Sequence, residues 1–117
     1  MAREWDKGIV ISELSDEPAL SEEITALIDR IKAAKKAPHV VLNFAQVTYV
    51  NSSNLAQLLR VRKVLAEQGK TLKICSLSDQ VWSVFLVTGL DKVFRFAPDP
   101  MTALAGLQIE DADRTGG

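Results

Sequence analysis

The chain has 117 residues, of which 47% are hydrophobic and 25% are charged, and its 14 basic and 15 acidic residues give a formal net charge of −1. This length suits one domain with a single core, and the balanced charge gives no electrostatic reason to expect a nucleic acid or an anionic membrane as partner. The single cysteine and single histidine exclude an internal disulfide and a metal site built from several thiolates or imidazoles. Because no apolar run reaches the length of a membrane span and the N-terminus lacks a signal-peptide pattern, we expect a cytoplasmic protein without membrane insertion.

The first third of the chain predicts a hairpin followed by a helix. In "REWDKGIVISEL", Trp5 lies on one arm, residues 6 to 8 form a turn, and the second arm is apolar. Ser15, Asp16 and Pro18 supply helix-start chemistry. Apolar residues then recur at spacings of three and four, as on one side of an amphipathic helix: Leu20, Ile24, Leu27, Ile28 and Ile31.

The middle of the chain alternates strand and helix patterns. "HVVLNF", residues 39–44, is a continuously apolar run typical of a strand covered on both faces. A helix is predicted over residues 53–68, with Gly69 at the position of a left-handed C-terminal cap. "TLKICSL", residues 71–77, predicts the next strand, in which Cys75 is a buried and inert residue.

The last third repeats this alternation. Ser78 or Asp79 can cap a third helix that runs through Leu86 and ends at Gly89. "KVFRF", residues 92–96, predicts a final strand. "DPMTALAGL" predicts a last helix capped by Asp99, and the polar residues after it are expected to fray.

Strands that alternate with helices indicate an α/β fold with right-handed crossovers. We therefore predict a single domain over residues 1–108, with a mixed, mostly parallel sheet of about four to five strands and four helices. Residues 109–117 are predicted to form a polar C-terminal tail.

Motifs of catalysis are missing from the sequence. The chain has no glycine-rich phosphate loop, no dinucleotide fingerprint and no metal-ligand spacing. His39 is the one imidazole that could activate a serine nucleophile, and its place at the start of an apolar strand favours a structural role. We therefore expect no enzyme, no catalytic residue, no metal and no cofactor.

The segment Asn51-Ser52-Ser53-Asn54 joins an apolar stretch to a leucine-rich helix. One of these side chains is expected to cap the helix by accepting a hydrogen bond from a free backbone N–H. The same geometry permits a second interpretation, because a helix N-terminus can accommodate a phosphate added to an exposed serine. Such a phosphate would make the surface more negative by nearly two units of charge, so phosphorylation could switch the binding of a partner on or off. Both interpretations remain open on the chemistry of the residues alone.

"VVLNFAQVTYVNSSNLAQLL" resembles the central motif of STAS domains, the fold of bacterial anti-sigma factor antagonists. "GKTLKICSLSDQVWSVFLVTGLDKVFRFAPDPMTAL" is similar to the family's strand, helix, Gly-Leu and final strand in order and spacing, so the resemblance covers about residues 39–107. It implies a signalling protein of transcription regulation whose partner is both anti-sigma factor and serine kinase. In this family the unphosphorylated form binds the partner, and a phosphatase resets the phosphorylated form.

By position in the family motif, the resemblance implies that Ser52 is the phosphoacceptor and Ser53 a neighbouring capping hydroxyl. Asn51, Ser53, Asn54 and Gln57 are the implied partner-binding positions. Asn51 stands where the family usually has aspartate, so a carboxylate near the acceptor is missing. Asn54 stands where the family usually has glycine, which would add a side chain where the partner's backbone approaches.

Two other functions fit the same resemblance. The chain could be a non-phosphorylated STAS subunit of a larger assembly, such as a stress-signalling or lipid-transport complex, or a sensor of a nucleotide or lipid near the serines. The third predicted helix is also more apolar than a one-sided surface helix requires. Trp82 either covers the neighbouring second helix or forms, with Leu86, an apolar interface for a partner or a weak homodimer.

Overall fold

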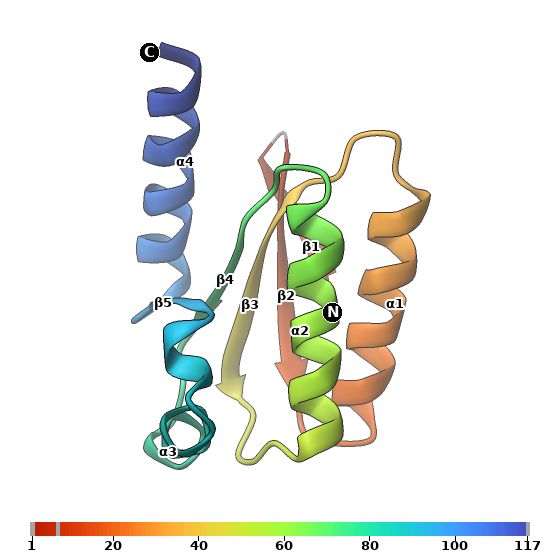
Figure 1. Ribbon diagram of the computed structural model, residues 1–117, viewed down its shortest axis with the longest axis vertical. Helices are drawn as coiled ribbons and strands as arrows, with labels where there is room; N and C mark the ends of the chain where they lie inside the picture. The colour runs from red at the N-terminus through yellow and green to blue at the C-terminus, as the bar shows by residue number, and fades with distance from the viewer. Residues whose placement is uncertain (1, 7, 117) are drawn as a thin grey trace.

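The computed structural model describes residues 2–6 and 8–116, with the side chains of residues 8–109, and shows one five-stranded sheet with helices on both faces (Figure 1). The strands lie in the order β1-β2-β3-β4-β5. They span Ala2–Asp6 (β1), Ile9–Ser15 (β2), His39–Gln46 (β3), Leu72–Cys75 (β4) and Arg95–Ala97 (β5). β1 pairs antiparallel with β2, and all the other pairs are parallel, which confirms the predicted α/β class and mostly parallel sheet.

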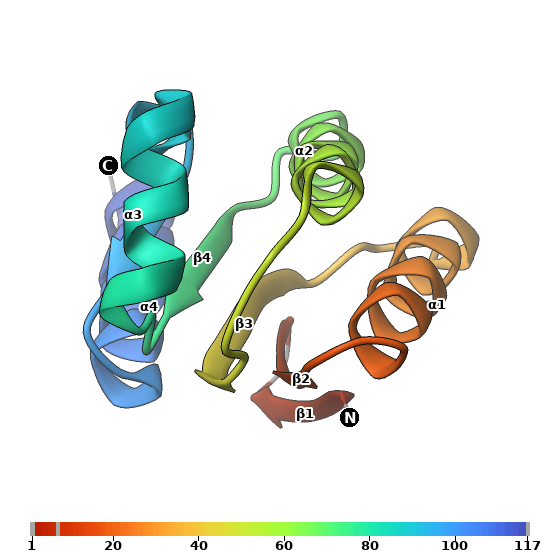
Figure 2. The ribbon, with the colours of Figure 1, turned by 90° about the horizontal axis from the view of Figure 1, so that it is seen from below.

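The helices are divided between the two faces of the sheet (Figure 2). Helices α1 (Ala19–Ala33), α2 (Ser52–Ala66) and α3 (Asp79–Thr88) share one core with the strand residues Val40, Leu42 and Ile74. Helix α4 (Pro100–Gly116) covers the other face and packs against alternate strand residues, including Val41 and Cys75. The connections between neighbouring parallel strands are all right-handed, which places their helices on the same face of the sheet. Because successive side chains of a strand point to opposite faces, each face of the sheet has its own core.

An aromatic cluster joins α3 to β5 at the edge of the larger core. The ring centroids of Trp82 and Phe96 lie 5.0 Å apart at an interplanar angle of 84°, and Phe85 contacts both Phe94 and Phe96 edge-on. The ring contact that the structure shows for Trp82 is therefore with β5, an arrangement that neither of the two interpretations of Trp82 from the sequence included. Edge-to-face aromatic pairs of this kind add to the stabilisation that burial provides.

Several predicted caps are confirmed. Ser78 caps α3, where its Oγ accepts a hydrogen bond from the N–H of Val81, and Gly89 ends the helix with a φ of 76°. Asp99 caps α4, because its Oδ1 accepts a hydrogen bond from the N–H of Thr102 at 2.8 Å. Cys75 is buried, as predicted.

Other boundaries differ from the sequence prediction. The final strand begins only at Arg95, because residues 90–92 form a short 3-10 helix (η1, Leu90–Lys92). Helix α2 spans Ser52–Ala66 rather than 53–68, and Gly69 takes a φ of 70° beyond its end, where the N–H of Lys70 bonds back to the carbonyl of Leu65.

Residues 109–116, predicted to fray, continue α4 as helix, and no proline after Pro100 interrupts it there. The division of the chain at residue 108 stays a prediction, and residue 7 of the predicted turn lies outside the described residues. None of the helices within residues 2–6 and 8–116 has the length and apolarity that a membrane crossing demands.

Candidate functional site at the start of helix α2

Two asparagines, not the serines, cap helix α2. The Oδ1 of Asn51 accepts a hydrogen bond from the N–H of Asn54 at 2.8 Å, and the Oδ1 of Asn54 accepts one from the N–H of Asn51 at 3.0 Å. This reciprocal pair is a capping box in which asparagine takes the place of the usual glutamate or glutamine. The prediction that one residue of the segment caps the helix is therefore confirmed, and that residue is Asn51.

Ser52 and Ser53 occupy the first two positions of α2, and both are exposed. Within the part of the chain that the structure describes, neither hydroxyl forms a hydrogen bond. The implied role of Ser53 as a capping hydroxyl is therefore wrong. A cap must precede the first helical residue so that its side chain can reach back to the free N–H groups, and Asn51 holds that position.

Asn54 is buried in the contact between α2 and α1, with 0% of its surface exposed. Its Nδ2 lies 3.3 Å from the Oε2 of Glu17, 3.4 Å from the Oγ of Ser21 and 3.5 Å from the Oε1 of Gln57. The side chain of Asn54 is therefore turned into the fold and does not project from the surface, and the predicted contact of this position with a partner stays a prediction. The third helical position of α2 faces inward, beside the buried Leu55.

Glu17 anchors a polar network that the sequence analysis missed. Its carboxylate accepts hydrogen bonds from both the N–H and the hydroxyl of Ser21, each at 2.5 Å. These bonds, with the hydroxyl of Ser21 contributing most and Asn54 adding to them, hold the pKa of Glu17 below its usual value. Gln57 continues the network to α1, since its Nε2 lies 3.4 Å from the Oγ1 of Thr25. Glu17 and Asn54 are 37 positions apart, and no motif in the sequence predicts that they meet. The sequence indicates only that the residues around Glu17 are polar and suited to start a helix.

Asp16 fixes the segment that leads into α2. Its carboxylate accepts hydrogen bonds from the N–H of Thr48 at 2.8 Å and from the hydroxyl of Thr48 at 2.6 Å. The hydroxyl of Thr48, followed by its N–H, lowers the pKa of Asp16, and the N–H of Tyr49 adds to the effect. Asp16 was expected to supply helix-start chemistry for α1, but α1 begins after Pro18 without a side-chain cap. The side chain is instead used to hold the residues before Asn51.

A few exposed side chains lie above the hydrogen-bonded network of Asp16, Glu17 and Asn54. Tyr49 is 53% exposed, while Val50 between it and Asn51 is buried. The first turn of α2 carries no acidic residue. The N–H groups of Ser52 and Ser53 precede the first intrahelical bond, which runs from the N–H of Leu55 to the carbonyl of Asn51. Unpaired N–H groups and the positive end of the helix dipole make this surface suitable for a phosphate group.

A catalytic or metal-binding role for the serines receives no support from their surroundings. His39 is buried on β3, where its Nδ1 accepts a hydrogen bond from the N–H of Thr71 at 3.0 Å, so its role is structural, as the sequence predicts. Among the described residues, no three side chains of the metal-ligating types come together.

The other candidate surface lies on α3. Trp82 is half-buried against Phe96, whereas Leu86 is 49% exposed and Val87 is 88% exposed. The apolar interface at Trp82 and Leu86 stays a prediction, in which Leu86 and the exposed part of Trp82 lie four positions apart on α3. The exposed apolar part of α3 consists of Leu86 and Val87.

Comparison with known proteins places this arrangement in context. Residues 17–103 match the family model of the STAS domain. A relative named anti-sigma F factor antagonist, from Paenibacillus polymyxa, is 23% identical over 108 residues, which cover 91% of this chain and 92% of that protein. The fold is also similar to that of a putative anti-sigma factor antagonist from Thermotoga maritima, with a TM-score of 0.78, 15% identity, and coverage of 92% of this chain and 93% of that one. A chain from a structure that describes the molecular architecture of the stressosome, a signal integration and transduction hub, gives a TM-score of 0.75 at 13% identity and covers 95% of this chain and 98% of its own.

Proposed function

The chain belongs to the STAS domain family, and on that premise we propose that it is an anti-sigma factor antagonist that binds an anti-sigma factor with serine kinase activity and is switched by phosphorylation of Ser52. The observation that carries this proposal is that different residues cap α2 and present a free hydroxyl at its start. Asn51 and Asn54 cap the helix, while the hydroxyl of Ser52 is exposed and forms no hydrogen bond within the described residues. Modification of Ser52 therefore removes no interaction that holds the fold.

The electrostatics at Ser52 suit a reversible modification. A phosphate there would meet the positive end of the α2 dipole and the free N–H groups of the first turn, so the helix would stay intact. It would add about 1.5 to 2 negative charges to the surface that includes Tyr49 and Ser53. A partner that docks on this surface in the unphosphorylated state would then be repelled, and a phosphatase would restore binding.

Asn51 is compatible with this function although the family usually has aspartate at its position. Its side chain accepts the hydrogen bond of the Asn54 N–H, and an aspartate would accept the same bond. Asn51→Asp should therefore keep the fold and restore the missing carboxylate. If the carboxylate helps to orient the acceptor hydroxyl, this variant will be phosphorylated faster by the partner kinase than the unchanged protein.

The experiment that tests the proposal uses the anti-sigma factor kinase of the same cells. Binding is measured by calorimetry and phosphorylation by mass spectrometry for Ser52→Ala, Ser52→Asp and the matched control Ser53→Ala. We expect Ser52→Asp to bind at least about tenfold more weakly because of its added charge, and Ser52→Ala to bind normally but resist phosphorylation. The control should still be phosphorylated at Ser52, because only the neighbouring hydroxyl is removed. If both Ser52 variants bind the kinase normally and Ser52→Ala is still phosphorylated, the proposal is wrong.

A second candidate function keeps the fold and drops the switch. The asparagine at position 51 favours a constitutive subunit of a larger signalling assembly, since the family's usual carboxylate beside the phosphoacceptor is missing. Phosphopeptide mass spectrometry on the protein from its native cells separates the two candidates. Phosphate on Ser52 supports the switch, and its absence under all growth and stress conditions supports the constitutive subunit.

A further inference from the structure

A groove with basic sides lies between the end of α1 and the C-terminal half of α2, two helices that lie side by side on one face of the sheet (Figure 2). Its volume is about 580 Å³. Three of the residues that line it are basic and one is acidic: Lys32, Leu59, Arg60, Lys63, Val64 and Glu67. Positive charge therefore dominates in the groove, although the chain as a whole has a formal net charge of −1.

The cations of the groove are not neutralised by the described part of the fold. Lys32, Arg60 and Lys63 are exposed, and within the residues that the structure describes none of them forms an ion pair, Glu67 included. Helix α2 itself contains no acidic residue that could pair with Arg60 or Lys63. These two cations are three positions apart, and like charges at neighbouring positions on a helix surface destabilise the helix.

Helix electrostatics explain only part of this arrangement. The helix dipole favours cations in the last turn, which accounts for Lys32 at the end of α1 and Lys63 at the end of α2. Arg60 lies more than one turn before the end of α2, where that effect has faded. An anionic partner in the groove would compensate all three charges.

The groove also offers apolar contact. Leu59 is 38% exposed between the cations, and Val64 is buried among the residues that line the groove. Because most of the lining side chains are exposed, the groove would not enclose a small molecule as a ligand site normally does. A nucleic acid would use the cations but not the apolar strip. An amphipathic helix uses both, since its apolar side enters a groove while its charged side chains lie at the rim.

The groove and the serines share one side of α2. Ser52, Leu59 and Lys63 follow one another at spacings of seven and four, which places them in one row along the helix. Ser52 and Lys63 are separated by roughly 16 Å along the helix axis. A standard interface covers about 800 Å² on each partner, a patch roughly 30 Å across, so one partner can contact both positions.

We propose that this groove docks an acidic amphipathic helix of the anti-sigma factor kinase, with its apolar side chains against Leu59 and its carboxylates beside the three cations. The identity of this partner rests on the proposed function, because a kinase that acts on Ser52 must dock beside it. The groove would recognise the kinase through charge complementarity, while the phosphate on Ser52 would control the other end of the same contact.

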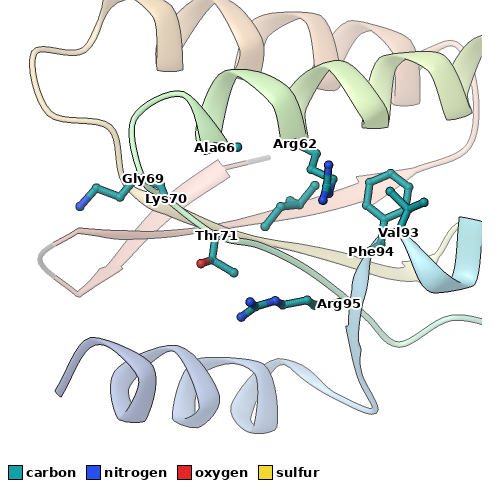
Figure 3. Close-up of a pocket in the computed structure, with 9 residues that line it drawn as sticks. Arg62, Ala66, Gly69, Lys70, Thr71, Val93, Phe94 and Arg95 are labelled. Carbon is teal, nitrogen blue, oxygen red and sulfur yellow. The ribbon is translucent and has the colours of Figure 1, made fainter. Parts of the chain in front are cut away.

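The test measures binding of the full chain to the kinase by calorimetry at several salt concentrations, together with the steady-state kinetics of Ser52 phosphorylation. Arg60→Gln and Lys63→Gln should each weaken binding by about threefold at low salt and reduce its salt dependence. The KM for the chain should rise while kcat stays unchanged, because the groove is remote from the reacting hydroxyl. Arg62→Gln is the matched control: it removes the same charge from the same helix, but Arg62 lines a different cavity beside β4 and β5 (Figure 3).

The chemistry of the occupant is tested by photo-cross-linking. A benzophenone amino acid in place of Leu59 should become joined to the kinase, and mass spectrometry should identify the joined kinase peptide as acidic. A cross-link to a basic kinase peptide, to a second copy of this chain or to a co-purified nucleic acid would overturn the proposal, because the groove would then have another occupant.

The outcomes separate this docking site from the switch. If Arg60→Gln and Lys63→Gln bind and are phosphorylated like the unchanged chain at every salt concentration, the docking site is wrong, even where Ser52 is phosphorylated. Equal losses in Arg62→Gln and Lys63→Gln would also overturn it, because they would show a general effect of net charge. Weaker binding of Lys63→Gln, but not of Arg62→Gln, to a kinase that never phosphorylates Ser52 would support the docking site and refute the switch.

Discussion

Replacement of Asn54 by glycine tests whether the buried amide holds the start of α2 in place. The side chain of Asn54 is completely buried, completes the capping box with Asn51 and donates toward Glu17 and Gln57. Glycine is also the residue that the family usually has at this position, so the variant restores the common motif. We nevertheless expect it to be less stable, because the surrounding network is built to bind an amide.

The size of the effect follows from two contributions. The hydrogen bond from the N–H of Asn51 to the Oδ1 of Asn54 is lost, at a cost of about 1 kcal/mol. Glycine in a helix adds roughly 0.5 kcal/mol because it has more conformational freedom in the unfolded chain. The free energy of unfolding should therefore fall by about 1.5 kcal/mol, which for a chain of this size lowers the Tm by roughly 6 °C.

Ser53→Gly is the matched control for this measurement. It places glycine one position earlier in the same turn, where the exposed serine hydroxyl forms no hydrogen bond within the described residues. Only the helix-propensity cost of about 0.5 kcal/mol should appear. Both variants are compared by urea unfolding followed by far-UV circular dichroism, with the slope of the transition checked for two-state behaviour. Equal midpoints for Asn54→Gly and Ser53→Gly would refute the reasoning, because the side chain of Asn54 would then contribute nothing.

Two further predictions concern titration and reactivity. The hydrogen bonds from Ser21 lower the pKa of Glu17 in the folded chain, so its ionised form stabilises the fold above the ordinary value of 4.5, and this stabilisation is lost as the pH falls through the lowered folded-state pKa. Glu17→Gln should therefore flatten the loss of stability below about pH 4.5, measured by urea unfolding at several acid pH values, and an unchanged slope would contradict this. Burial raises the pKa of the Cys75 thiol, so iodoacetamide should label the native chain at least about a hundredfold more slowly than the chain in urea, as followed by mass spectrometry. Equal labelling rates would show that β4 opens in the native state.

Local features of this protein could be predicted from the sequence because their partners lie within a few residues. Ser78 reaches the N–H of Val81 and Asp99 reaches that of Thr102, three positions along in each case. The order of strands and helices follows from the periodicity of apolar residues, which depends only on the geometry of each element. The position of a helix start between Asn51 and Asn54 was predictable for the same reason.

The composition of the candidate site was decided by tertiary structure. The amide of Asn54 meets the carboxylate of Glu17 across 37 positions of the chain, and Trp82 contacts Phe96 on a separate strand. Such pairs form only after α1 has packed on α2 and α3 on β5, because burial selects which side chains turn inward. That a polar, serine-bearing turn begins α2 follows from the residue types at positions 51 to 54 alone. The packing of α1 against that turn decided that the side chain of Asn54 is buried beside Glu17 and Ser21, whereas Ser52 on the outer side stays exposed.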